Sequence, residues 1–394
     1  MGLKSYPKEY FELMLVGFTL IMGMSLSSAF LPIFAHELDP SGLLVGFVIS
    51  AWSFSRVFTE LPSGILADRF GRRRLLVGGL ALSALGAFLC SMAYSVYLLI
   101  VGRTFWGLGT ALFFMSSTAL LFDLFKSNVR GRALGTFQGI EFTGSLIGAP
   151  MGSFLVAILD YRGVFSLAFI SILCSFLIAF FSKGLRQTDA EESKRSEISL
   201  SELLPSLRSW SLAAVCIYSF SRMLIMSGLN DTVFPLYLNL ELGIGIELIG
   251  LIISLRTAGA IIATVTSGFL SDRFGRKPMI VLGLIMQSSC YYAYTILSSF
   301  EMFLLFGLFE GFSRGMSMTS AMVLLSEIVP SRLRAGGIGI YRTFMDIGGF
   351  FGPLFFITLF DRSATTPFLS ALVILALNTV LLSTIKSKRA VSPV

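Results

Sequence analysis

Residues 64–74 read GILADRFGRRR and residues 268–278 read GFLSDRFGRKP, so seven of eleven positions agree at an offset of 204 residues. A long apolar run ends at the first glycine of each stretch, and another run begins just after each basic cluster. Each stretch therefore predicts a tight, charged hairpin between two helices. A basic signal at the end of a membrane helix would explain the arginines. It does not explain Gly, Asp and Gly at the same spacing twice.

The repeat extends well beyond the two hairpins. At the same offset, LVGFVIS at 44–50 faces LIGLIIS at 248–254, Asp123 faces Glu327, and Arg130 faces Arg334. Three glycines of the first half also face glycines of the second. One offset that holds over so much of the chain indicates two structurally equivalent halves.

Composition indicates a membrane protein. Hydrophobic residues make up 55% of the chain and charged residues 13%, whereas soluble domains carry about 25% charged residues. The net charge of +7 does not suggest a nucleic-acid partner, because the basic residues follow the loops. The four cysteines are isolated within apolar runs and the only histidine is His36, so we expect neither a disulfide framework nor a metal site.

Twelve apolar segments are each long enough to cross a hydrocarbon core of ~30 Å at ~1.5 Å per residue. We predict an all-α integral membrane protein with twelve transmembrane helices in two six-helix halves, residues 1–182 and 209–394, joined by a polar cytoplasmic linker at 183–208. The predicted spans are 10–34, 42–66, 75–94, 96–122, 131–157, 163–182, 209–238, 243–270, 279–298, 302–326, 333–360 and 365–385.

Loop charge predicts the orientation of these spans. Of the 30 lysines and arginines, 22 lie at the termini and in the loops that follow even-numbered spans, two lie in the loops on the other side, and six lie inside spans. Because basic residues concentrate on the cytoplasmic side, both termini are expected in the cytoplasm.

The hairpins resemble the loop motif of major facilitator superfamily transporters, between helices 2 and 3 and again between helices 8 and 9. RTFWGLG at 103–109 resembles the helix 4 motif of that family, with Trp106 where a glutamine is common. A further set resembles the helix 5 motif of the antiporters, with Ala149 departing from the usual Gly-Pro pair: Gly135, Gly144, Gly148, Pro150 and Gly152. The resemblance implies alternating access, with helices 1, 4, 7 and 10 lining a cavity and helices 2, 5, 8 and 11 meeting across the halves.

Enzyme signatures fail on closer inspection, and we expect no enzyme and no cofactor. Residues 311–315 fit a nucleophile elbow, but they lie in mid-span with no strand before them. Nothing resembles a phosphate-binding loop, so ATP does not drive this protein directly.

The chemistry must then rest on charges inside the membrane, which are costly unless they face partners, water or a cavity. Three pairs stand four residues apart on one helix face: Arg56 with Glu60, Glu310 with Arg314, and Arg342 with Asp346. Either each pair neutralises itself, or an arginine tunes an acid that gains and loses a proton. The candidates for proton coupling are Asp231, Glu310, Glu141 and Arg103, and those for the cavity are Arg222, Met226, Phe113 and Arg314.

Two further groups are predicted at the cytoplasmic side. A latch, by resemblance, ties each hairpin to the ends of other helices, and its residues are Gly64, Asp68, Gly71, Arg72, Asp123, Arg334, Asp272, Arg276, Glu327 and Arg130. An inner gate pairs Glu60 with Arg342, Arg56 with Asp346, and Glu141 with Arg256 across the halves, because the members of each pair lie at similar depth.

These features favour a proton-coupled exporter of amphipathic or drug-like small molecules, acting as a monomer in the cell membrane, with the lipid bilayer, its substrate and protons as its partners. The alternatives are a transporter of a sugar, a metabolite or a lysolipid, and a non-transporting membrane sensor on the same fold. Acids inside the membrane favour transport, because a scaffold would not need them.

Overall fold

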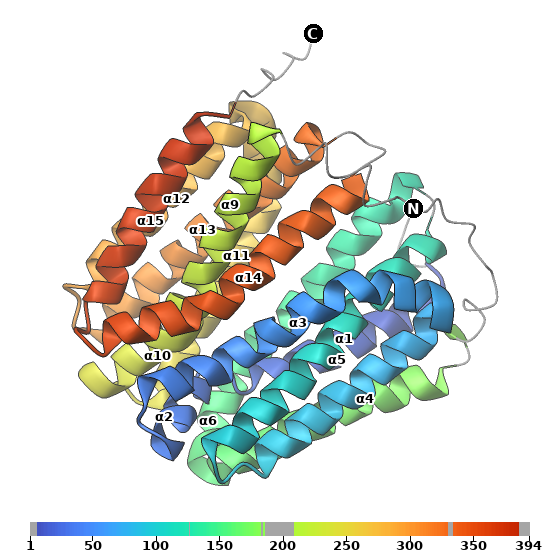
Figure 1. Ribbon diagram of the computed structural model, residues 1–394, viewed down its shortest axis with the longest axis horizontal. Coiled ribbons are helices and arrows are strands. Elements are labelled where there is room, and N and C mark those ends of the chain that lie inside the picture. Colours follow the sequence, from blue (N-terminus) through green and yellow to red (C-terminus); the bar gives the residue numbers. More distant parts are fainter. Residues whose placement is uncertain (1–5, 126, 183, 186–208, 330–333, 386–394) are drawn as a thin grey trace. The chain divides into compact units, whose positions relative to one another are not determined.

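The computed structural model describes residues 6–125, 127–182, 184–185, 209–329 and 334–385. The side chains of 60–70, 127, 128, 268, 269, 272 and 334–336 lie outside this description. Within the described ranges every regular element is a helix (Figure 1), which confirms the predicted all-helical class. Eight of these helices are long and apolar enough to cross a membrane. The count of twelve spans and the cytoplasmic termini stay predictions.

Contacts divide the chain into two compact units. The first holds residues 1–195 with 245–250, and the second holds 196–244 with 251–394. The predicted boundaries at 182 and 209 stay a prediction.

Within its described residues the first unit contains six helical elements, of which α6 is two helices joined at Asp160. α5 packs against α3 and α4, and α6 packs against α1 and α4. Glycines allow α4 and α5 to approach closely: a Cβ on Gly79 would lie 2.7 Å from the carbonyl oxygen of Gly109. The helices are α1 (Lys8–Ser25), α2 (Leu31–Leu38), α3 (Gly42–Phe70), α4 (Arg72–Ser91), α5 (Val96–Leu124) and α6 (Ser127–Phe181).

The structure interrupts one predicted span of this unit and narrows one predicted gap. The span predicted at 10–34 is interrupted by a turn between α1 and α2, where Pro32 lies in the first turn of the new helix and would clash inside a continuous one. The predicted break at 158–162 is confirmed at Asp160, where two helices meet at a non-helical residue with φ 59°. The Asp160 carboxylate accepts the N–H of Gly163 at 2.8 Å, which stabilises this unusual backbone.

The second unit contains the remaining described helices, except that the first residues of α11, up to Gly250, belong to the first unit. α9 and η3 pack against α14, and α12 contacts both α13 and α15. The predicted span 209–238 is helical from Trp210 to Glu241 but π-helical in its middle. The elements are α9 (Trp210–Leu224), η3 (Ile225–Val233), α10 (Phe234–Leu236), η4 (Tyr237–Glu241), α11 (Ile246–Phe274), α12 (Arg276–Tyr294), α13 (Phe300–Ile328), α14 (Arg334–Phe360) and α15 (Thr366–Ser383).

The two predicted hairpins are confirmed as one-residue breaks between helices. Gly71 separates α3 from α4 with φ 86°, and Gly275 separates α11 from α12 with φ 90°. This region of the backbone favours glycine because a Cβ would clash there. The glycine spacing in the repeated motif therefore has a conformational cause.

Candidate functional site

A buried ion pair between a carboxylate and a guanidinium joins α13 to α11 in the second unit. Glu310 has 0% of its side chain exposed and Arg256 has 4%. Arg256 Nε donates to Glu310 Oε2 at 2.9 Å, and its guanidinium also lies over the ring of Phe234, 4.7 Å from the centroid. A charge-assisted bond of this kind offsets the cost of burying both ions.

The second carboxylate oxygen of Glu310 accepts from three neutral groups. Gln287 Nε2 lies 3.1 Å from Oε1, and Asn230 Nδ2 and the Tyr291 hydroxyl each lie 3.3 Å from it. The same two amides also donate to the Tyr291 oxygen at 2.9 Å. We call these five residues, Arg256 and Glu310 included, the polar cluster.

The π-helical turn of η3 supplies Asn230. Thr232 Oγ1 donates to the carbonyl oxygen of Ser227, five residues back, at 2.7 Å, and π-turns inside helices are frequent at functional sites. At Gly228 the segment lies so close to α14 that an added Cβ would overlap the backbone of Gly352. The wide turn and the close contact together hold Asn230 against Glu310.

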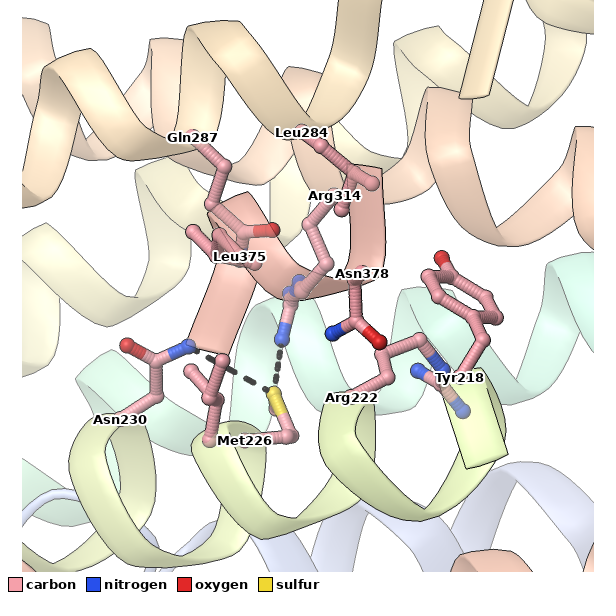
Figure 2. Close-up of a pocket in the computed structure, with 10 residues that line it drawn as sticks. Tyr218, Arg222, Met226, Asn230, Leu284, Gln287, Arg314, Leu375 and Asn378 are labelled. Atoms are coloured by element: carbon pink, nitrogen blue, oxygen red, sulfur yellow. Dashed lines mark hydrogen bonds between the residues drawn. The ribbon is translucent and has the colours of Figure 1, made fainter. Parts of the chain in front are cut away.

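A small pocket adjoins the polar cluster (Figure 2). Its free volume is about 10 Å³, which is room for about one water molecule and far below the ~300–1,000 Å³ of ordinary small-molecule sites. Asn230 and Gln287 belong both to its wall and to the polar cluster. The other lining residues are Tyr218, Arg222, Ile225, Met226, Leu284, Arg314, Leu375 and Asn378.

The two arginines of the pocket contact methionine sulfurs. Arg314 Nη1 bonds to Met226 Sδ, as Figure 2 shows. Arg222 lies 3.2 Å from Met345 Sδ and 3.6 Å from Met318 Sδ. Three of the four predicted cavity residues, Arg222, Met226 and Arg314, thus line one pocket.

Phe113, the fourth predicted cavity residue, does not line this pocket. It is fully buried in the first unit, 5.4 Å from Phe114 between ring centroids and next to Gly79 of α4. The close approach of α4 to α5 places this ring in the helix packing.

Glu310 pairs with an arginine of another helix, and Arg314 of its own helix also acts on it electrostatically. Arg256 bonds to Glu310 and Arg314 contacts Met226. The predicted gate bridge between Arg256 and Glu141 stays a prediction. Helix spacing alone made Arg314 a neighbour of Glu310. The packing of α11 against α13, where an added Cβ on Gly311 would overlap the backbone of Arg256, brings the stronger partner.

The remaining proton-coupling candidates are not members of the polar cluster. Asp231 is half-buried in η3, and its neighbour Asn230 is the residue that contacts Glu310. In the first unit Arg103 lies over the ring of Trp106, 5.6 Å from the centroid, and Glu141 is half-buried on α6. Their coupling roles stay predictions.

At the hairpins the structure brings some predicted latch residues together. Arg72 forms an ion pair with Asp123 and donates to the carbonyl oxygen of Ala119 at 3.1 Å. Arg276 Nε lies 3.1 Å from Glu327 Oε1. Both pairs lie inside one unit each, and the cross-unit ties stay predictions.

Other predicted latch and gate residues divide into two groups. In the first group, Arg130 donates to the Phe125 carbonyl oxygen at 2.8 Å, and Arg56 is buried over Trp52, 4.6 Å from the ring centroid. Asp346 is fully buried on α14, and Arg342 is half-buried. The side chains at five positions, Glu60, Gly64, Asp68, Asp272 and Arg334, lie outside the described residues. The gate pairs Glu60–Arg342 and Arg56–Asp346 stay predictions.

Sequence reasoning missed Asn230, Gln287, Tyr291 and Asn378. All four are polar side chains inside apolar runs, and Gln287 and Tyr291 share a helix face at a spacing of four. The spacing of these polar residues was visible in the sequence, but charged residues inside the spans were the stronger indication of a site.

Comparisons with known proteins agree with this architecture. A sequence model of the Major Facilitator Superfamily matches residues 13–230 and 212–393. Multidrug resistance protein 1 of Bacillus subtilis strain 168 is 26% identical over 367 residues, covering 91% of this chain and 92% of that protein. Quinolone resistance protein NorA of Staphylococcus aureus strain MRSA252 is 23% identical over 399 residues, covering 97% and 98%.

Solved structures show the same fold. A D-xylose–proton symporter matches with a TM-score of 0.76 and 18% identity over 95% of this chain and 96% of its own. A bacterial homologue of the human lysosomal transporter Spinster matches with a TM-score of 0.79 and 14% identity over 95% of both chains. At sequence identities of 18% and 14%, these similarities show a shared fold only.

Proposed function

The chain belongs to the Major Facilitator Superfamily, and on that basis we propose that it exports amphipathic, drug-like small molecules in exchange for protons by alternating access. The relatives named for multidrug and quinolone resistance support this substrate class. The chain is a multi-pass protein of the cell membrane. Twelve spans with both termini in the cytoplasm complete the proposal, supported by the bias of loop charge.

One observation carries the proposal: a fully buried carboxylate shares its hydrogen-bond donors with a pocket. Glu310 is held by Arg256 on one oxygen, and by Asn230 and Gln287, which also line the pocket, on the other. Ionisable groups buried in membrane helices mark ion and substrate pathways. Glu310 is therefore our choice among the predicted proton carriers.

The shared amides link the ligand to the proton. A carboxylate that loses hydrogen-bond donors takes up a proton more readily. A ligand that donates to the amide oxygens of Asn230 and Gln287 holds their N–H groups on Glu310 and favours the ionised acid. Protonation of Glu310 releases the same groups. Ligand and proton then disfavour each other, which is the linkage that exchange requires.

Glu310→Gln tests this function in proteoliposomes that contain the purified protein and a fluorescent quinolone. We expect gradient-driven accumulation to fall by about tenfold or more, within the usual ~5–150-fold range of coupling between sites, while equilibrium binding of the quinolone persists. The glutamine side chain keeps the shape of glutamate but has no carboxyl group that can bind and release a proton.

Glu301→Gln is the matched control, since Glu301 lies exposed in the first turn of the same helix. It should transport as the unaltered protein does. If Glu310→Gln still concentrates the quinolone when a pH gradient is imposed, Glu310 is not the coupling acid, and Asp231→Asn and Glu141→Gln become the next variants to measure.

A further inference from the structure

We propose that the pocket of the second unit binds the acidic group of an amphipathic organic anion between Arg222 and Arg314. The inference rests on the proposed function in one respect, because it takes this pocket as part of the substrate site of the exporter. It adds the charge and the polarity of the compound that the pocket accepts.

The charge of the wall is the first argument. Two guanidinium groups line the pocket, and its lining residues include no carboxylate. Among the described residues, no acid forms a salt bridge with either arginine, and the nearest partners are the sulfurs of Met226, Met318 and Met345. Both arginines are half-buried, and the charge of Arg314 also acts on Glu310. The Arg222 guanidinium thus lacks the counter-ion that normally accompanies a cation withdrawn from water.

The nature of these partners is the second argument. A thioether sulfur is a weak acceptor, whereas a guanidinium presents up to five N–H donors in a planar fork that matches an oxyanion. Within the described part of the chain, Arg222 Nε is buried without an acceptor. Methionine side chains are flexible, so an incoming carboxylate or phosphate can displace them and take stronger bonds.

Asn378 is the third argument, and it is independent of the arginines. This residue of α15 is only 2% exposed and lines the same pocket. Its Nδ2 donates no hydrogen bond to any described residue. Figure 2 shows Asn378 among the residues that line the pocket together with Arg222 and Arg314. A buried amide donor without an acceptor is costly, and an oxyanion would satisfy it together with the two guanidiniums.

The rest of the wall defines the body of the ligand. Ile225, Leu284 and Leu375 present aliphatic surface and Tyr218 presents a ring. The free volume of about 10 Å³ has room for about one water molecule, so an acid group enters only as the flexible methionine side chains move aside. The opened pocket then suits the acidic end of an amphipathic molecule.

The polar cluster does not account for Arg222. Glu310 already receives a charge-assisted bond from Arg256 and three neutral donors. Arg222 lies on α9 and contacts Met318 of α13 and Met345 of α14 rather than the acid. The positive charge of Arg222 therefore remains for a ligand, while that of Arg314 also acts on Glu310.

The test compares three probes with one apolar body and different charge: 2-naphthoate, 2-naphthamide and 2-naphthylmethylammonium. Equilibrium binding to the purified full chain is measured by probe fluorescence, with protein-free micelles as the blank. We expect the anion to bind about tenfold more tightly than the amide, and the cation most weakly, because charge-assisted hydrogen bonds discriminate on this scale. Equal affinities of the three probes for the unaltered protein would overturn the inference without any variant.

Arg222→Gln and Arg314→Gln should each weaken 2-naphthoate by about tenfold and leave 2-naphthamide within about twofold. Arg362→Gln removes the same charge from an exposed loop position and should change neither. A preference for the anion that survives the double variant Arg222→Gln with Arg314→Gln would place the anion elsewhere.

Glu310→Gln separates this inference from the proposed function. The variant should lose gradient-driven transport yet keep the anion preference. Anion binding in a protein that shows no proton-driven export would contradict the proposed function alone. Proton-driven export without any anion preference would contradict this inference alone.

Discussion

The hydroxyl of Tyr291 is the junction of the polar cluster at the scale of single residues. It accepts from Asn230 and Gln287 at 2.9 Å each and lies 3.3 Å from Glu310 Oε1. Every one of these side chains is at least 95% buried, so no bulk water replaces a lost partner. Removing the Tyr291 hydroxyl therefore costs the free energy of leaving buried N–H donors without an acceptor.

Tyr291→Phe should destabilise the protein by about 1–3 kcal/mol, because the two amides lose their shared acceptor inside the unit. The measurement is the thermal unfolding of the purified protein. Tyr292→Phe is the matched control, since the Tyr292 side chain is 56% exposed. If the two variants melt at the same temperature, the Tyr291 hydroxyl does not bridge the amides.

At the scale of elements, the π-turn in η3 decides which side chain of the segment faces α13. An α-helix advances about 100° per residue and a π-helix less, so the wide turn shifts the inward face along the sequence. The bond from Thr232 to the Ser227 carbonyl at 2.7 Å marks this turn. It explains why Asn230, and not the charged Asp231, contacts Glu310.

Thr232→Val should loosen the π-turn, because valine keeps the shape of threonine but loses the hydroxyl that bonds five residues back. We expect slower proton-driven transport with the protein still folded. Thr264→Val is the control, since its hydroxyl bonds only the ordinary fourth residue back, at 2.8 Å on an exposed face of α11. Equal transport by both variants would remove the π-turn from the mechanism.

At the scale of the whole molecule, the distribution of basic residues sets the topology. With 22 lysines and arginines on one side and two on the other, both termini are predicted in the cytoplasm. Single cysteines at Ser5 and Ser392, in a background without Cys90, Cys174, Cys216 and Cys290, should resist an impermeant thiol reagent on intact cells.

A cysteine at Ser363 provides the positive control for this experiment. Ser363 lies exposed in the short loop between α14 and α15, which the same charge bias assigns to the outer side, and it should be labelled. Labelling at Ser5 or Ser392 comparable to that at Ser363 would overturn the orientation.

The sequence by itself determined the class of the protein and the positions of its hairpins. These features depend on local sequence alone. The thickness of the bilayer requires long apolar runs, and a one-residue turn at positive φ requires Gly71 and Gly275. Basic residues collect in the loops on the cytoplasmic side of the membrane. The helical extents of α3, α5 and α13 could be predicted within a few residues for the same reason. Local deviations such as the turn before Pro32 were not predicted.

Only the tertiary structure decided which polar side chains of different helices bond to one another. Glu310 meets Arg256 from 54 residues away and Gln287 from 23 away, and no spacing rule relates side chains on different helices. Rotation of each helix about its axis, which depends on packing glycines and on the π-turn, selects Asn230 over Asp231 and sends Arg314 to Met226. Sequence identifies the residues that are costly to bury, whereas packing determines how each of them is satisfied.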